Sequence, residues 1–206
     1  IVGSINNTAL TKIRFDTIKS IQISGLNQNQ NTNLLESIKE LNLKNIFFLN
    51  GNEISKIISS NNLVENYEIF KKYPNALDIK IKKTDFLAKI NNNGKIFLIG
   101  TNGKLSDVKF SDKEVPFIFG KPMIDEFIKF TNIIEQSKLS LNQVKNLYFF
   151  PSKRWDLELK NNVILKLSKD HTKLSLDQAF ELINDKNFKK IKVVDARIKN
   201  QIILND

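Results

Sequence analysis

The residues of this chain whose types could support catalysis are few and widely spaced. His171 is the only histidine, and it lies in the polar stretch SKDHTK with no cysteine or second histidine to share a metal or activate a nucleophile. Asp156 and Glu158 alternate with leucines, which predicts two carboxylates on the solvent face of a strand, not an acid–base pair. The sequence has no phosphate-loop, dinucleotide-binding, nucleophile-elbow or zinc-protease motif. We therefore favour a binding protein or scaffold over an enzyme, and we expect no cofactor and no metal.

The chain is strongly basic, but its basic residues are almost all of one kind. The net charge is +10, and 29 of the 32 basic residues are lysine, with arginine only at Arg14, Arg154 and Arg197. Proteins that read nucleic acids favour arginine for bidentate contacts to bases and phosphates. Lysine, asparagine and isoleucine are enriched together, as an AT-rich coding sequence would produce. We therefore expect no nucleic-acid partner, while non-specific attraction to anionic lipid headgroups stays open.

The chain lacks cysteine, which excludes thiol catalysis, disulfides and the usual structural zinc sites without fixing the compartment. It also lacks any run of 18 or more apolar residues that could span a bilayer. Its first residues, IVGSINN, have no initiator methionine, so we expect a fragment whose signal or membrane anchor lies upstream.

The first 82 residues predict a β-α-α-β-β unit. IKSIQISGL alternates isoleucines and ends in a glycine, as a strand running into a turn does. Asn33 and Glu36 resemble a helix start, and Asn52 can cap a second short helix. Two strands then flank a turn that contains Pro74 and Asn75, and in the second strand Leu77 begins an alternation of apolar and charged residues.

The remaining residues predict a mostly antiparallel β domain with two helices. Asn93-Gly94 is a strong hairpin turn, residues 123–137 have helical spacing, and a capping box that starts at Ser175 opens the last helix. Between the helices, the segments VKNLYFF, RWDLELKNN and VILKLSK predict a three-stranded meander. Trp155 is expected in the core with Arg154 stacked on it or paired nearby, and a partner-contact anchor is the alternative.

The fold class is therefore α+β in two domains. We assign an N-terminal segment to residues 1–17, the first domain to 18–85 and the second to 86–206. The chain closes with VVDARIKNQIILND, which predicts a strand, a turn at Lys199 and Asn200, and a final strand at Ile202–Leu204. A sheet edge carries unpaired N–H and C=O groups that proteins normally guard, so this edge needs a cover or a partner.

In their order and spacing these segments resemble the FtsQ/DivIB family of bacterial cell-division proteins, from about residue 18 to residue 204. IKSIQISGL is similar to the opening strand of the family's POTRA domain. YPNALDIKIKK resembles its Pro-Asn-x-Leu-x-Ile-x-Ile strand, so that Pro74, Asn75 and Leu77 match. RWDLELKNNVILKL resembles the Arg-Trp-x-Leu-x-Leu-x-Asn-Gly strand pair through Arg154 and Trp155.

Further segments resemble the family in the same order. VPFIFG is similar to its Leu-Pro-x-x-x-Gly segment, and VVDAR to its closing Val-Asp-Leu-Arg, which aligns Asp195 and Arg197. FLIGTNGKL resembles the Leu-Ile-Asp-x-x-Gly element, with Gly100 in place of the aspartate. Other departures are Asn162 for a glycine and the segment KTDF, residues 83–86, for Glu-Arg-x-Pro.

The resemblance implies a non-catalytic scaffold of the divisome. Such a protein is anchored in the inner membrane by one N-terminal helix, with the POTRA and β domains in the periplasm. It binds FtsB and FtsL, helps to control septal peptidoglycan synthesis, and meets other divisome proteins through the POTRA domain.

The resemblance also implies a partner site at the last helix and the final strand, where FtsB adds a β-strand. Ile198 stands where an aromatic residue often follows the family's functional arginine. The residues carried over to this sequence are Arg197, Ile198, Lys199, Asn200, Gln201, Ile202, Ile203 and Leu204 on the edge, with Phe180 on the last helix.

Three other functions stay open on the sequence alone. A POTRA-containing outer-membrane assembly or secretion factor shares the first domain, but further POTRA units or a barrel should follow it. A basic nucleic-acid binder would show steeply salt-dependent binding to generic DNA. An unrecognised hydrolase would need a carboxylate pair that the fold brings together in a pocket.

Overall fold

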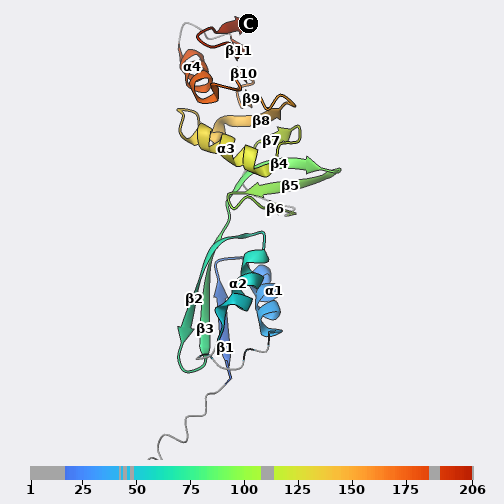
Figure 1. Cartoon of the computed structure of the whole chain (residues 1–206), viewed down its shortest axis with the longest axis vertical. Coiled ribbons are helices and arrows are strands. Elements are labelled where there is room, and N and C mark those ends of the chain that lie inside the picture. Colours follow the sequence, from blue (N-terminus) through green and yellow to red (C-terminus); the bar gives the residue numbers. More distant parts are fainter. Residues whose placement is uncertain are drawn as a thin grey trace, which may run out of the picture. The chain divides into compact units, whose positions relative to one another are not determined.

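The computed structural model describes residues 17–41, 43, 46, 49–107, 114–185 and 191–205. The chain divides into two compact units between Lys83 and Thr84 (Figure 1). The predicted N-terminal segment, residues 1–17, lies outside the described residues except for Thr17. Within the described ranges, no helix has the length and apolar character needed to cross a bilayer.

The first unit has the predicted β-α-α-β-β order. Its three-stranded sheet has the order β1-β3-β2, with β1 parallel and β2 antiparallel to the central strand. The two helices cover one face, where Leu34, Ile38, Ile54 and Ile58 pack on Leu77. The elements are β1 (Ser20–Ser24), α1 (Gln28–Lys39), α2 (Gly51–Ser60), β2 (Val64–Lys72) and β3 (Ala76–Lys83).

Both helices of this unit begin earlier than the sequence predicts. The side chain of Asn27 accepts the Gln30 N–H at 2.9 Å and caps α1, so Asn33 lies inside the helix and not at its start. The side chain of Asn50 accepts the Asn52 N–H at 3.1 Å and caps α2. The predicted caps were wrong because this stretch contains several asparagines, and the backbone conformation decides which of them caps the first turn of each helix.

Pro74, Asn75 and Leu77, which resemble the family's Pro-Asn-x-Leu strand, stabilise the turn and the core of the first unit. Pro74 and Asn75 form the turn between β2 and β3, and the carbonyl of Asn75 accepts the Lys19 N–H at 2.8 Å just before β1. Leu77 is 1% exposed in the core of the unit. Gly25, after β1, has φ +110°, and a Cβ there would run into the backbone of Ile81.

The second unit is one mixed sheet with two helices. Its strand order, in the described residues, is β12-β11-β10-β9-β8-β7-β4-β5-β6. The elements are β4 (Phe86–Asn92), β5 (Lys95–Gly100), β6 (Leu105–Ser106), β7 (Phe117–Phe119), α3 (Ile124–Glu135), the 3-10 turn η2 (Leu141–Gln143), β8 (Val144–Phe149), β9 (Trp155–Leu159), β10 (Ile164–Leu167), α4 (Thr172–Asn184), β11 (Val193–Ala196) and β12 (Ile203–Asn205).

Most neighbouring strands of this sheet are antiparallel, as predicted, including the β8-β9-β10 meander. The Asn93-Gly94 hairpin joins β4 and β5, with positive φ at both residues as a tight two-residue turn requires. The parallel pairs are β4 with β7, β7 with β8, and β10 with β11. Parallel neighbours need a crossover connection, and α3 and α4 supply those between β7 and β8 and between β10 and β11.

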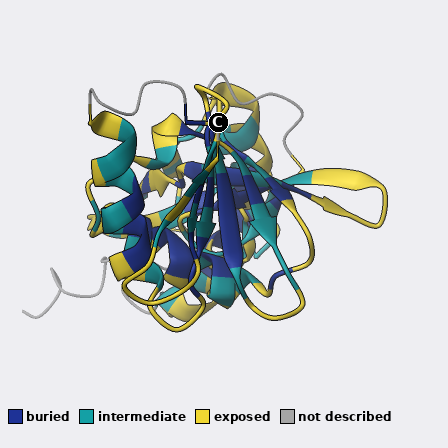
Figure 2. Cartoon of the chain, turned by 90° about the horizontal axis from the view of Figure 1, so that it is seen from above, coloured by how far each residue is buried: buried dark blue, intermediate teal, exposed yellow. Residues whose placement is uncertain are grey.

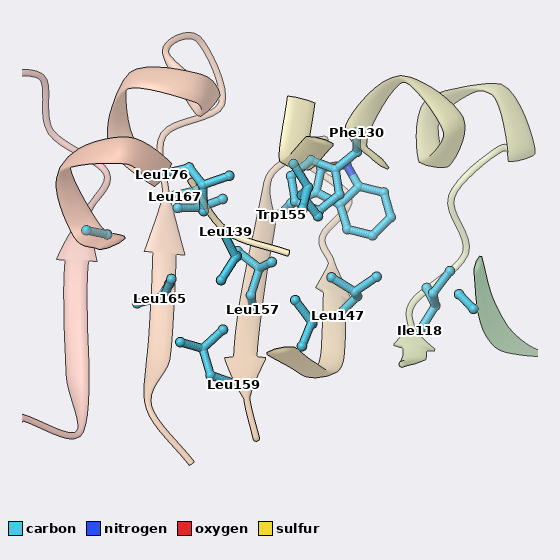
Figure 3. Close-up of a cluster of buried hydrophobic side chains, with 14 of the residues drawn as sticks. Ile118, Phe130, Leu139, Leu147, Trp155, Leu157, Leu159, Leu165, Leu167 and Leu176 are labelled. Atoms are coloured by element: carbon cyan, nitrogen blue, oxygen red, sulfur yellow. The ribbon is translucent and has the colours of Figure 1, made fainter. Parts of the chain in front are cut away.

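One row of apolar residues explains why the helices lie on a single face. The register places Ile118, Leu147, Leu157, Leu165 and Val194 side by side on adjacent strands. All five are buried, and α3 and α4 pack their own apolar side chains onto this row (Figure 3). The strand centres are buried while the turns that join them are exposed (Figure 2).

The start of α4 differs from the predicted capping box. The helix begins at Thr172, after His171, which makes no side-chain capping bond. Ser175 is buried inside the helix, where its hydroxyl accepts the Ser168 N–H at 3.1 Å and donates to the Thr172 carbonyl at 2.9 Å. The prediction was wrong because a serine hydroxyl can bond to the preceding turn as well as to the helix start.

Candidate protein-binding edge

The last strand forms one end of the large sheet. Strand β12 begins at Ile203, one residue later than predicted, so Gln201 and Ile202 belong to the approach and not to the strand. Asn200 has φ +60°, and the Gln201 N–H donates to the Ile198 carbonyl at 3.2 Å. This tight turn occupies the residues before the strand and delays its first pairing with β11.

The register of β11 fixes which of its residues face β12. The N–H of Ile164 in β10 donates to the Lys192 carbonyl at 2.8 Å, so the Lys192 carbonyl points toward β10. The backbone groups of successive strand residues point to opposite sides. Val193 and Asp195 therefore turn their backbone groups toward β12.

The open side of β12 follows from this register. Asn205 and Ile203 lie opposite the two residues that face them, so their N–H and C=O groups are used within the sheet. The N–H and C=O of Leu204 point the other way, where no strand of the described residues pairs with β12. Leu204 thus carries the main-chain donor and acceptor that an added strand would meet.

The side chains of the edge divide between core and solvent. Leu204 and Ile202 are partly buried and pack against the main apolar cluster. Ile203 is 45% exposed and Ile198 is 57% exposed, so both present apolar surface outside the core. Lys199 is exposed beside them at the turn. The edge therefore combines an anchored backbone with apolar side chains that a partner could cover.

Arg197 forms a close ion pair at the end of β11. Its Nη2 lies 2.5 Å from Asp195 Oδ2, and its Nε lies 2.8 Å from Asp195 Oδ1. The hydrogen bonds and charge of Arg197 lower the pKa of the Asp195 carboxyl, and those of Asp195 raise the pKa of Arg197. The arginine side chain stays 45% exposed. It is held in one direction while its remaining N–H groups can reach a partner.

Trp155 lies in the core and Arg154 is paired nearby, as the sequence predicts. Trp155 is 6% exposed and stacks on Phe130 at 4.6 Å with the rings nearly parallel. Arg154 does not stack on the tryptophan; it lies over the Phe150 ring at 4.2 Å and donates from Nε to Asp156 at 3.1 Å.

The expectation of a wet Asp156 was wrong. Its side chain is buried, and Oδ1 also accepts the Leu167 N–H at 3.3 Å. Alternation correctly predicts that Asp156 and Glu158 lie on the face opposite the helices, but Arg154 covers the first of them. Both carboxylates are engaged in hydrogen bonds within the sheet and do not form an acid–base pair. The described residues contain no group of three potential metal ligands.

Phe180 belongs to α4 and is partly buried against the main apolar cluster. It borders a cavity of about 270 Å³ with Leu159, Lys160 and Ile183, and none of the edge residues lines this cavity. The structure brings Arg197 to Leu204 together at one end of the sheet. Phe180 packs against the same main apolar cluster as Ile202 and Leu204.

Sequence reasoning missed a polar cluster around Glu158. This carboxylate accepts from Lys145 Nζ, Asn146 Nδ2 and Tyr148 Oη, each at 2.8 Å. These bonds, that of Lys145 foremost, lower the pKa of Glu158 to about 2. A break in the β8–β9 register between Val144 and Asn146 brings Lys145 to this carboxylate. Periodicity alone does not reveal such a bulge.

Comparisons with known proteins cover most of the chain. Residues 17–83 match the profile of the POTRA domain, FtsQ-type, and residues 79–197 match that of cell division protein FtsQ/DivIB, C-terminal. The chain is 27% identical over 182 residues to cell division protein DivIB of Clostridium tetani, covering 79% of this chain and 65% of that protein. It is 24% identical over 208 residues to cell division protein FtsQ of Rickettsia prowazekii, covering 93% and 72%.

Two further similarities are partial. The match to cell division protein DivIB of Clostridium acetobutylicum has 30% identity over 102 residues. The chain thus spans 41% and 65% of the lengths of the two Clostridium relatives. A solved structure, the major extracytoplasmic domain of DivIB from Geobacillus stearothermophilus, is 17% identical with a TM-score of 0.34, covering 50% of this chain and 96% of that one.

Proposed function

Because the chain belongs to the FtsQ/DivIB family of cell-division proteins, whose members are non-catalytic, we propose that it is a divisome scaffold that binds FtsB by β-strand addition at β12. FtsL binds in the same assembly, and the complex helps to regulate septal peptidoglycan synthesis. The observation that carries this proposal is the open side of β12, where the main-chain groups of Leu204 face no strand of the described residues.

The edge supports strand addition in both affinity and specificity. Main-chain hydrogen bonds supply affinity in this binding mode, and alternate side chains supply specificity. Ile203 and Ile198 offer exposed apolar surface, and Arg197 offers a positioned guanidinium to a carboxylate of the partner. Lys199, Asn200 and Gln201 form the turn that ends beside this strand.

The proposal extends to the rest of the protein. The POTRA domain, assigned to residues 18–85, contacts other divisome proteins, and the β domain, residues 86–206, carries the FtsB site. A transmembrane helix upstream of this sequence anchors the protein in the inner membrane, with both domains in the periplasm. The match of residues 79–197 to the family's C-terminal domain favours this function over an outer-membrane assembly factor or a nucleic-acid binder.

Two variants at one position test the proposal. Leu204→Ala removes a partly buried side chain but keeps the outward N–H, whereas Leu204→Pro also removes the donor and places a ring at the open edge. We expect calorimetry with the periplasmic segment of FtsB to show at least about tenfold weaker binding for the proline variant than for the alanine variant, about 1.4 kcal/mol. Circular dichroism confirms that both are folded. Equal affinities of the two folded variants would contradict strand addition at β12.

A further inference from the structure

A second exposed surface lies on the face of the large sheet opposite α3 and α4. There, Phe117 and Phe119 of β7 lie 4.9 Å apart between ring centroids. Phe119 stacks on Tyr148 of the neighbouring strand at 5.1 Å and is 45% exposed. We call these three residues the aromatic strip. Phe117 and Tyr148 are half-buried, so Phe119 is the part of the strip that a partner can cover.

A basic hollow adjoins the aromatic strip. The register places Lys89 of β4 directly opposite Phe117. Lys89 also lines a cavity of about 450 Å³, which we call the lysine pocket. Its lining residues are Lys89, Glu114, Val115, Val144, Lys145 and Lys160. Three lysines that are far apart in the sequence thus line one cavity beside the aromatic strip.

The two acidic neighbours of the lysine pocket differ in how firmly they are held. Glu158 is 15% exposed and holds Lys145 through the 2.8 Å ion pair, which leaves this lysine fixed at the rim. Glu114 is 88% exposed and meets Lys160 at 3.0 Å. The hydrogen bond and charge of Lys160, and then the charge of Lys89, lower the pKa of Glu114. An exposed pair of this kind is weak, so another carboxylate can replace Glu114.

We propose that the lysine pocket and the aromatic strip bind an acidic segment of a partner protein that carries an apolar side chain. A carboxylate of the segment displaces Glu114 and pairs with Lys160 and Lys89, and the apolar side chain covers Phe119. A nucleic acid fits less well, because bases stack on open aromatic faces and Phe119 and Tyr148 already stack on each other. The site is separate from β12 and does not rest on strand addition there.

The test uses the whole chain and a fluorescein-labelled ten-residue peptide with four glutamates and two phenylalanines, followed by fluorescence anisotropy. Removing one cation of a partly exposed pair weakens binding by about two- to fivefold. We therefore expect Lys160→Gln and Lys89→Gln each to lower the affinity by that factor. Glu114→Gln removes the competing carboxylate and should raise the affinity by a similar factor.

A matched control separates the pocket from the general basic charge. Lys138 is also exposed and pairs with a carboxylate, Glu181 Oε1 at 2.7 Å, but it does not line the lysine pocket. Lys138→Gln should therefore leave the affinity unchanged, and Leu204→Pro should also leave it unchanged. A peptide with glutamine in place of glutamate should bind at least fivefold more weakly.

Several results would overturn the proposal. These are the absence of saturable binding, an equal loss for Lys138→Gln and Lys160→Gln, or weaker binding after Glu114→Gln. Binding of single-stranded DNA or of anionic phosphatidylglycerol vesicles that depends on Lys89 and Lys160 and excludes the peptide would equally overturn it.

Discussion

Replacing Glu158 by glutamine should destabilise the β domain at neutral pH, and the effect should fade in acid. The carboxylate accepts three hydrogen bonds, from Lys145, Asn146 and Tyr148, and its pKa falls from 4.5 to about 2. Glutamine keeps the size of the side chain but loses the negative charge to which all three groups donate.

The magnitude follows from linkage between protonation and folding. A pKa shift from 4.5 to about 2 corresponds to at most about 3–4 kcal/mol, since one pKa unit is about 1.4 kcal/mol. Lys145 is 49% exposed, so solvent screening reduces the contribution to about 1–2 kcal/mol. A depressed pKa in the folded state gives stability that is present above pH 4.5 and lost as the pH falls toward 2.

Urea unfolding followed by tryptophan fluorescence measures this difference. Trp155 is the only tryptophan and lies in the core of the unit that contains Glu158, so the signal reports on that unit. We expect a difference of about 1–2 kcal/mol between the two proteins at pH 7, shrinking to less than half at pH 3. A difference that is independent of pH, or that grows in acid, would refute the account of this cluster.

Three other substitutions test the core, a close approach and the edge. Trp155→Ala should cost about 3–5 kcal/mol in thermal unfolding followed by circular dichroism; a loss below about 1 kcal/mol would exclude a core role. Gly100→Ala should cost about 1–3 kcal/mol in urea unfolding, because the new Cβ would lie 2.6 Å from Asn102 Oδ1 and 2.7 Å from Thr84 Oγ1; adding Thr84→Ala should recover part of this loss, and strict additivity would speak against the contact with Thr84. Ile198→Tyr restores the aromatic residue of the family and should strengthen FtsB binding in calorimetry while changing stability by less than about 0.5 kcal/mol; unchanged affinity would show that this side chain does not meet the partner.

Two departures from the family pattern meet in the structure. Thr84 stands where the family has arginine, and Gly100 where it has aspartate. The Thr84 hydroxyl lies 3.0 Å from that of Thr101 and accepts the Asn102 N–H at 3.3 Å. A Cβ at Gly100 would crowd this small network.

The sequence was sufficient for the order of the elements and for most turns. Alternation around Leu77 and Leu157 predicted buried strands, and Asn93-Gly94 predicted its hairpin, because these signals are local. The helix starts were harder. Asn27 and Asn33 are chemically equal as caps, and the Ser175 hydroxyl can bond either to the following N–H groups or to the preceding turn. The position of each helix start therefore depends on tertiary packing, which local sequence patterns do not reveal.

The candidate site was predicted in outline only. The family pattern places Arg197 and the final strand at an edge, but the outward direction of Leu204 depends on the register of β10, β11 and β12. The lysine pocket was not predicted, since Lys89, Lys145 and Lys160 come from separate segments and meet only in the folded sheet. Non-local pairing of this kind leaves no periodic signal in the chain.

The most direct test of the central claim is amide hydrogen exchange at β12, resolved by residue with NMR, with and without the periplasmic segment of FtsB. Ile203 and Asn205 direct their N–H groups to β11, so they should be protected in the free protein. The Leu204 amide should exchange rapidly in the free protein and become strongly protected in the complex. If its exchange is unchanged while FtsB is bound, the partner does not add a strand to this edge.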